Sequence, residues 1–202
     1  MLNDFFLNLY GQLNTVIPGF VLDFIINHMT MRLVLANLVC FVLTLGGWIL
    51  VDQLGCSFDK AIRHFQIYRF VTSMFVHDGP GHLMANMSSL IINGLIVEST
   101  FGPQAMLIFY FGSGIIGGIA ACIIHKVLGD ECISVGASGA ICGLMGVTIM
   151  NTVTGLGITG NLLYVLIAVI PILIIGFSRG ADNVCHFTSF FAGAALFFFL
   201  RM

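Results

Sequence analysis

Residues 104–124 read QAMLIFYFGSGIIGGIAACII and contain no Asp, Glu, Lys or Arg. At 1.5 Å per residue, a helix of this length crosses a hydrocarbon core about 30 Å thick. The rest of the chain has the same character, because 58% of its 202 residues are hydrophobic and only 8% are charged, with a mean hydropathy of +1.06. A soluble domain has about 25% charged residues. The composition therefore predicts an integral membrane protein, and a net charge of −2 leaves no basic surface for nucleic acid.

Charged residues and turn residues divide the chain into six apolar runs, each long enough to cross or nearly cross a bilayer as a helix. No alternation of period two, which a membrane barrel requires, is visible. We therefore predict an all-α fold, a polytopic bundle of six transmembrane helices. A long loop at about 52–81, the most charged part of the chain, separates the first two helices. The predicted spans are 33–51, 82–97, 104–124, 138–154, 161–177 and 184–200.

The first part of the chain, residues 1–32, is apolar only in patches, which Asn, Asp, Gly11 and Pro18 interrupt. We predict an N-terminal interfacial segment here, a helical hairpin that lies on the membrane. A seventh, broken span is the alternative. The six-helix core then covers residues 33–202.

Small residues recur within the predicted helices at a spacing of four. Lipid tails give helices no hydrophobic reason to associate, so close contact over small faces must hold them together. The spacing therefore predicts tight helix packing, and a compact bundle accounts for these residues without any function. The pairs are Gly114 with Gly118, Gly139 with Gly143, and Ser189 with Gly193.

Most of the six cysteines lie in or beside apolar runs, where they are expected to act as small packing residues. Cys56 and Cys132 instead lie in two loops that the six-helix topology places on the same side of the membrane. A disulfide between them is possible in an oxidising compartment. No metal-ligand spacing is apparent in the sequence.

Ser138 stands at the start of the fourth apolar run, in the string Gly136-Ala137-Ser138-Gly139. The string alone is weak evidence, because glycine and serine are abundant here. Its position adds more, because the free N–H groups and the positive dipole end of a helix N-terminus favour a developing anion. The alternative is that Ser138 merely caps the helix.

Three further polar residues enter the apolar runs near the same membrane face as Ser138. His186 begins the sixth run and shares a helix face with the small residues Ser189 and Gly193, although a lone His at a helix end is often only interfacial. His82 and Asn86 are four residues apart, so they share one face of the second helix. They could donate hydrogen bonds to an oxyanion, or simply hold two helices together. The coincidence of a Ser, a His and two donors favours nucleophilic catalysis.

At these residues the sequence resembles the rhomboid family of intramembrane serine proteases, with order and spacing that fit across about residues 33–200. The matching strings are HLMAN at 82–86 (family HxxxN), GASG at 136–139 (family GxSG) and His186 in the last helix. Tyr68-Arg69 stands where the family commonly has Trp-Arg, and Glu98 looks like the acidic residue that ends the family's second helix.

The resemblance implies a Ser138–His186 dyad that cleaves transmembrane segments of membrane proteins, with no cofactor and no metal. His82, Asn86 and the Ser138 backbone N–H would form the oxyanion hole. Gly136, Gly139, Arg69 and Glu98 would support the site. The fourth helix should begin below the membrane surface in a hydrated cavity, because water must reach the serine. The implied partners are transmembrane protein substrates and the lipid bilayer; the oligomeric state is left open.

Besides Tyr68, the sequence departs from the family pattern at three further positions. Family members often have Ala and Gly where this chain has Cys185 and Ser189, and an aromatic residue where it has Cys142. None of these changes removes a reacting group, so the expectation is an active enzyme. A catalytically weak or inactive rhomboid-like protein that binds membrane-protein clients is the main alternative, and a small transporter is another.

The resemblance also suggests a location, the bacterial inner membrane with the active site open to the periplasm. The family topology would leave two basic residues inside and five outside, which reverses the usual charge bias. The five outer residues are Lys60, Arg63, Arg69, Lys126 and Arg179.

Overall fold

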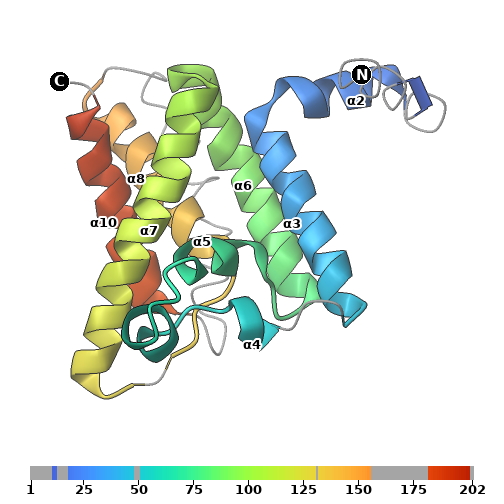
Figure 1. The fold of residues 1–202 in the computed structure, drawn as a ribbon. Helices are drawn as coiled ribbons and strands as arrows, with labels where there is room; N and C mark the ends of the chain where they lie inside the picture. Colours follow the sequence, from blue (N-terminus) through green and yellow to red (C-terminus); the bar gives the residue numbers. More distant parts are fainter. Residues whose placement is uncertain (1–10, 13–17, 48–50, 131, 156–181, 201–202) are drawn as a thin grey trace.

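The computed structural model describes residues 11–12, 18–47, 51–130, 132–155 and 182–200, and every regular element in these ranges is helical (Figure 1). A π-helical turn, η1, and a 3₁₀ turn, η2, supplement the α-helices in the loop after α3. The elements are α2 Gly19–Asn27, α3 Met29–Leu45, α4 Val51–Leu54, η1 Asp59–Arg63, α5 Arg69–Thr72, η2 Ser73–Phe75, α6 Pro80–Phe101, α7 Pro103–Leu128, α8 Ser138–Val153 and α10 Asn183–Phe199.

The all-helical prediction is confirmed for the described residues, whereas the count of six transmembrane helices is not. Within those residues, α7 is the helix that is long and apolar enough to cross a membrane by itself. The pair α2 and α3 meets the same criterion together but bends by 101° between the two helices. Helices α8 and α10 are apolar but shorter. The predicted fifth span, 161–177, lies outside the described residues.

Two predicted helix boundaries were wrong because of one carboxylate. Charged Glu98 was expected to end the second helix, but α6 continues past it to Phe101. The Glu98 oxygens accept hydrogen bonds from the backbone N–H groups of Met29 and Thr30, both at 2.8 Å, and from the Thr30 hydroxyl at 2.6 Å. Glu98 thus satisfies the free N–H groups at the N-terminus of α3, where a negative charge is favoured. Helix α3 therefore begins at Met29, four residues before the predicted start.

The other long helices agree with the predictions to within a few residues. Helix α8 begins at Ser138, as expected. Helix α7 runs four residues beyond the predicted end, to Leu128, and stops where Gly129 adopts a left-handed conformation with φ 73°. Pro80 and Pro103 occupy the first turns of α6 and α7, where a missing N–H has no cost.

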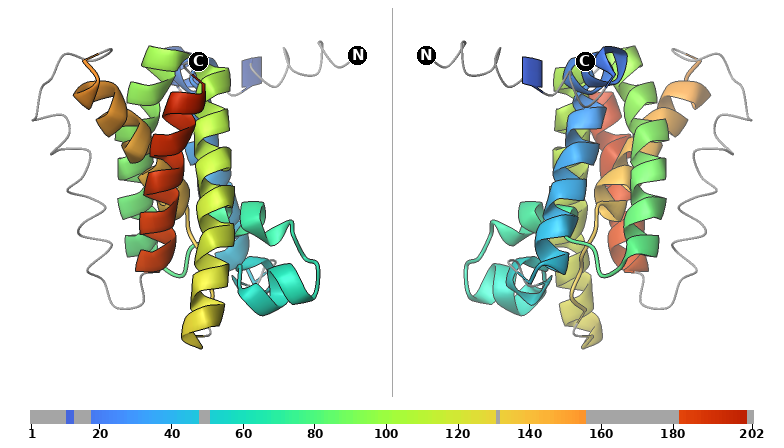
Figure 2. Two further views of the ribbon diagram at one scale, coloured as in Figure 1. Left: turned by 90° about the vertical axis from the view of Figure 1, so that its left-hand side faces the viewer. Right: turned by 90° about the vertical axis from the view of Figure 1, so that its right-hand side faces the viewer.

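The helices form a bundle around α8. Helix α10 packs along both α7 and α8, and α6 packs on α8 and on α3. Figures 1 and 2 show that α6, α8 and α10 run in one direction and that α3 and α7 run in the other. Every residue of α8 from Ser138 to Thr148 is buried. Helix α8 also begins nearer the middle of the bundle than α6 or α10 (Figure 1).

Contacts between glycine and backbone bring α8, α10 and α7 together, as the spacing of small residues predicts. A Cβ on Gly193 of α10 would overlap the carbonyl group of Gly143 in α8, and one on Gly146 would overlap the Phe190 carbonyl. On the α7 side, a Cβ on Gly117 would overlap Ser189. These helices therefore meet at distances that no larger residue at these positions permits.

The charged loop predicted at 52–81 is folded against the bundle and held by Arg69. The Arg69 guanidinium is buried and donates to the carbonyls of Asp52, at 3.0 Å, and Gly55, at 2.6 Å. Its Nε donates to the Gln66 side chain at 2.6 Å. This supports the structural role expected for Arg69.

The same loop reaches the segment before α8, but the disulfide that the sequence left possible is not formed. Cys56 and Ser134 exchange two backbone hydrogen bonds, of 2.9 and 2.7 Å. The Cys56 Sγ faces the Sγ of Cys122 at 3.9 Å rather than Cys132, and all six cysteines, each within the described residues, are free thiols. The register of the bridge turns the Cys56 side chain toward α7, so the Cys56–Cys132 disulfide considered from the sequence is not present.

We predict that Gly193→Ala destabilises the bundle by about 1 to 3 kcal/mol, because the added methyl group would meet backbone that cannot rotate away. Thermal unfolding in detergent measures the change. Gly118→Ala is the matched control, because its Cβ would lie 3.4 Å from the Phe70 ring, an ordinary contact. Equal unfolding midpoints for the two variants would contradict the packing argument.

Candidate active site

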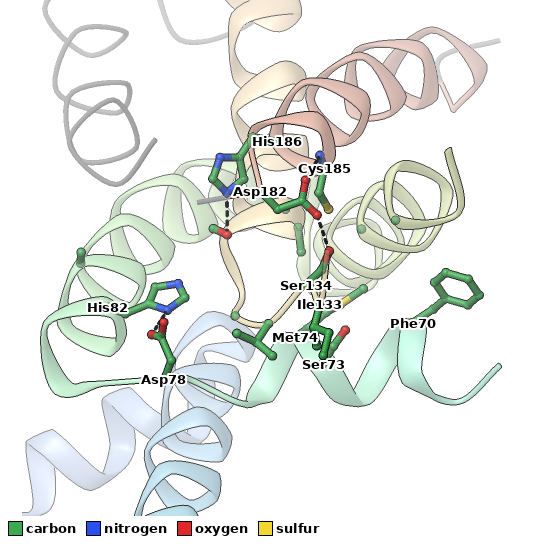
Figure 3. A pocket seen from close by; sticks show the side chains of 18 of the residues that line it. Phe70, Ser73, Met74, Asp78, His82, Ile133, Ser134, Asp182, Cys185 and His186 are labelled. Atoms are coloured by element: carbon green, nitrogen blue, oxygen red, sulfur yellow. Dashed lines mark hydrogen bonds and ion pairs between the residues drawn. The ribbon is translucent and has the colours of Figure 1, made fainter. Parts of the chain in front are cut away.

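Ser138 and His186, from the starts of two parallel helices, meet in the structure. The Ser138 Oγ lies 2.8 Å from the His186 Nε2, and both side chains are buried. Figure 3 shows the His186 ring directed at the serine. The two residues line a cavity of about 380 Å³, together with His82, Gly136, Asp182 and Cys185. A hydroxyl held against an imidazole nitrogen in a cavity is the arrangement of an activated nucleophile and its base.

The turn before α8 presents Ser138 to this cavity. Gly136 adopts φ 102°, in the region that side-chain-bearing residues rarely occupy, and its N–H donates to the Ser73 carbonyl at 2.8 Å. Ser138 is the first residue of α8, so its own backbone N–H is one of those without a partner inside the helix. Gly139 comes next, and a Cβ there would lie 3.0 Å from the Cys185 Sγ, so this glycine lets α10 approach.

Two side chains from α6 converge on Gly136. A Cβ built on Gly136 would lie 2.7 Å from the His82 Nε2 and 3.1 Å from the Asn86 Nδ2. The Asn86 amide is completely buried, and neither its nitrogen nor its oxygen has a hydrogen-bond partner among the described residues. A buried polar group without a partner is costly, so the Asn86 amide offers unused hydrogen-bonding capacity beside Gly136. The sequence-based placement of His82 and Asn86 beside the serine agrees with this geometry.

The structure adds Asp78 and His77, which the sequence analysis missed. The Asp78 carboxylate lies 2.6 Å from the His82 Nδ1 (Figure 3). The His77 ring is buried, lies edge-on to the His82 ring with centroids 5.1 Å apart, and accepts a hydrogen bond of 3.5 Å from the Ala137 N–H. Both residues stand just before the HLMAN string, in HDGPGH at 77–82. This density of polar residues was the only local indication that they belong to the site.

Asp182 organises the start of α10. Its carboxylate accepts hydrogen bonds from the Cys185 N–H at 2.9 Å and from the Ser134 hydroxyl, and it contacts the His125 Nε2 at 2.9 Å. Burial works to raise the pKa of Asp182, but these hydrogen bonds and the His125 ring outweigh it and hold the pKa below its usual range. Asp182 is therefore a carboxylate that caps the helix carrying His186.

The three departures from the family pattern fit the packing around the dyad. Ser189 lies against Gly117, whose missing side chain leaves room for it. Cys185 points toward Ser189, with their Sγ and Oγ atoms 3.8 Å apart. Cys142 is buried in α8 one turn after Ser138, and His186 keeps its bond to the serine with a thiol at this position. Arg69 and Glu98 do not line the cavity, and the support of the site expected of them stays a prediction.

Residues 64–202, more than half of the chain, match the family model of the Rhomboid domain. The chain belongs to the rhomboid family. RHOMBOID-like protein 5 of Arabidopsis thaliana is 34% identical over 154 residues, which are 74% of this rhomboid chain and 49% of that protein.

Other relatives differ in what their names state about activity. Rhomboid-like protease 3 of Toxoplasma gondii is 27% identical over 192 residues, 91% of this chain and 72% of that protein. Inactive RHOMBOID-like protein 8 of Arabidopsis thaliana is 29% identical over 140 residues, 67% of this chain and 39% of that protein. The rhomboid chain spans about half the length of the plant relatives, and membership of the family does not by itself establish proteolysis.

The relatives also correct the expected location. The rhomboid family consists of membrane proteins, in agreement with the composition, but the relatives named here come from a plant and from Toxoplasma gondii. A further plant relative, RHOMBOID-like protein 6, is named as mitochondrial. The bacterial inner membrane inferred from the resemblance is therefore not supported, because rhomboids occupy other membranes as well.

We predict that His77 makes the folded state sensitive to acid. Burial and the neighbouring His82 ring lower the pKa of His77 to about 4, and Asp78 only partly opposes this. An unfolded His binds a proton near pH 6.5. The stability that neutral His77 contributes is therefore complete above pH 6.5 and is lost as the pH falls toward 4, by up to about 1.4 kcal/mol per pH unit.

Thermal unfolding of the wild type and His77→Asn between pH 7.5 and 5 tests this expectation. The advantage of the wild type over the variant should shrink as the pH falls. His64→Asn is the control, because His64 is exposed beside Asp59. A constant difference between wild type and His77→Asn across this range would refute the assignment.

Proposed function

We propose that this rhomboid is an intramembrane serine endopeptidase that cleaves transmembrane segments of membrane proteins. The observation that carries the proposal is the 2.8 Å contact between the Ser138 Oγ and the His186 Nε2, in a cavity beside the unpartnered Asn86 amide. The relative named as a protease, which covers most of the chain, adds support. A substrate segment would unwind locally so that its peptide bond reaches the cavity.

In the first step the Ser138 Oγ attacks the scissile carbonyl carbon while its proton passes to the His186 Nε2. The carbonyl oxygen becomes an oxyanion, which accepts hydrogen bonds from the Ser138 N–H, the Asn86 Nδ2 and the His82 Nε2. His186 then gives its proton to the leaving amine, and an acyl-enzyme remains on Ser138. A water molecule attacks the acyl group with His186 again as base, which releases the acid and restores the serine.

The contact with Asp78 sets which hydrogen bonds His82 can donate in this role. The His82 Nδ1 lies 2.6 Å from the Asp78 carboxylate, to which it donates a hydrogen bond. For Nε2 to donate to an oxyanion at the same time, the ring must carry both protons, because a neutral imidazole has only one N–H. Asp78 balances that positive charge. The oxyanion would then meet a cation, which stabilises it more than a neutral donor does.

The alternative, an inactive rhomboid-like protein that binds membrane-protein clients, is favoured by one relative that is named as inactive. The presence of both Ser138 and His186 at hydrogen-bond distance argues against it here. Residues 1–32 remain a proposed interfacial segment, whose described part includes α2 and the first turn of α3. Helix α2 leaves α3 at 101°, and Phe20 and Phe24 on it are exposed, as expected for a helix lying along a membrane surface.

We predict that Ser138→Ala abolishes cleavage of a single-pass transmembrane substrate in proteoliposomes and that His186→Ala lowers kcat by at least 10³-fold. Gel analysis of the products measures both. Ser88→Ala is the matched control, because the exposed Ser88 hydroxyl bonds only to its own helix at the Met84 carbonyl. Equal cleavage by wild type and Ser138→Ala, or no cleavage by the wild type across a panel of such substrates, would contradict the proposed function.

We predict that Asp78→Asn lowers kcat about tenfold, a loss of ~1.4 kcal/mol in transition-state stabilisation, with KM unchanged. The charge on His82 matters when the oxyanion forms, so substrate binding should not respond. Asp59→Asn, which removes an exposed charge beside Arg63, is the control and should leave kcat at the wild-type value. A rise in KM with unchanged kcat, or a lower unfolding midpoint that explains the loss, would refute the positioning role of Asp78.

A further inference from the structure

At the edge of the active-site cavity, three potential metal ligands of different chemistry lie close together. His125 is at the end of α7, Cys132 in the loop before α8, and Asp182 at the start of α10. One ligand atom of each, an imidazole nitrogen, the Sγ and a carboxylate oxygen, lies within 4.8 Å of the other two. The side chains of His125 and Asp182 are about nine-tenths buried. The dyad does not use this group.

A second layer of hydrogen bonds orients two of the three ligands. The His125 Nδ1 lies 3.1 Å from the Asp130 carboxylate, so its N–H on that side donates to Asp130 and leaves Nε2 directed at Asp182, 2.9 Å away. The Ser134 hydroxyl donates to the second oxygen of Asp182 (Figure 3), and the Cys185 N–H donates to the first. A carboxylate behind a histidine is the arrangement that fixes ligating histidines in metal sites.

We propose that the His125 Nε2, the Cys132 Sγ and the Asp182 carboxylate bind a zinc ion, with water in the fourth position. Nitrogen, thiolate and carboxylate ligands are the set that Zn²⁺ accepts, in tetrahedral geometry. Binding requires a modest contraction of the three atoms and releases one proton from the His125 Nε2 and one from the Cys132 thiol to solvent. The two positive charges of the ion offset the carboxylates of Asp130 and Asp182 and the thiolate.

A bound ion would join three segments that surround the catalytic histidine. Asp182 caps α10 four residues before His186, and Ser134 and Asp182 both line the active-site cavity. The ion would tie this cap to the end of α7 and to the loop that leads into Ser138. The folded state is therefore stabilised when zinc is present, and the site offers a way for the metal to regulate the enzyme.

The spacing of the ligands explains why the sequence did not indicate a metal site. His125 and Cys132 are seven residues apart, and Asp182 comes from another helix fifty residues later. Short repeated ligand spacings, on which such motifs are recognised, are absent from this set. Only the packing of α10 against α7 brings the carboxylate to the other two ligands.

The test uses the full chain in detergent with the substitution Ser138→Ala, after removal of metals by a chelator, so that its result does not depend on proteolysis. Titration with Co²⁺ should give one bound ion per chain with the near-ultraviolet absorption of a thiolate–cobalt bond, and Zn²⁺ should displace it. Zinc at about 100 times its Kd should raise the unfolding midpoint by roughly 5 to 10 °C.

A second substitution in the Ser138→Ala chain, Cys132→Ser or His125→Gln, should remove both the thiolate–cobalt absorption and the thermal shift caused by zinc. Asp130→Asn, which keeps all three ligands, should weaken Co²⁺ binding by about 10- to 100-fold. Cys40→Ser, in α3 and away from the cluster, is the matched control and should change neither. No absorption and no shift before these changes, or an unchanged signal after Cys132→Ser, would overturn the proposal.

Discussion

The close approach of α8 and α10 is the constraint on which the site depends. Gly143 and Gly193 meet backbone to backbone, and Gly146 meets the Phe190 carbonyl, so the two helix axes lie nearer than any side chain would allow. Ser138 and His186 begin these same helices. Replacing one of these glycines by a larger residue would separate the helices and move the Ser138 Oγ and the His186 Nε2 out of their 2.8 Å contact. In a membrane, where packing replaces the hydrophobic effect between helices, small residues therefore determine how closely Ser138 and His186 approach.

Hydrogen bonds then fix the side chains and backbone around the dyad. Three polar groups near the dyad have hydrogen-bond partners. His82 contacts Asp78, the Cys185 N–H at the start of α10 donates to Asp182, and the Gly136 N–H donates to the Ser73 carbonyl. Asn86 differs from these groups, because neither polar atom of its buried amide has a hydrogen-bond partner among the described residues. Its Nδ2 lies beside Gly136, close to where the proposed oxyanion would form, so the proposed reaction would use this free donor.

The sequence predicted the helical fold and the main site residues because its few polar groups are conspicuous in an apolar chain. It located the starts of α8 and α10 to within a residue and placed His82 and Asn86 beside the serine. It misplaced the end of α6, because charged Glu98 was taken as the end of that helix. In the structure the Glu98 carboxylate is buried and accepts a hydrogen bond from the Thr30 N–H, 68 residues away. Asp78, His77 and the His125–Cys132–Asp182 cluster depend on contacts between separate elements, which no local pattern reveals.

The most direct test of the central claim, that Ser138 is a nucleophile activated by His186, is mass spectrometry of the chain after reaction with a fluorophosphonate. The probe transfers its phosphonyl group to an activated serine oxygen and loses fluoride, so the adduct marks that residue. The account predicts one adduct per chain, mapped to the peptide that contains Ser138 and strongly reduced by His186→Ala. An adduct on any other serine, or equal labelling with and without His186, would contradict it.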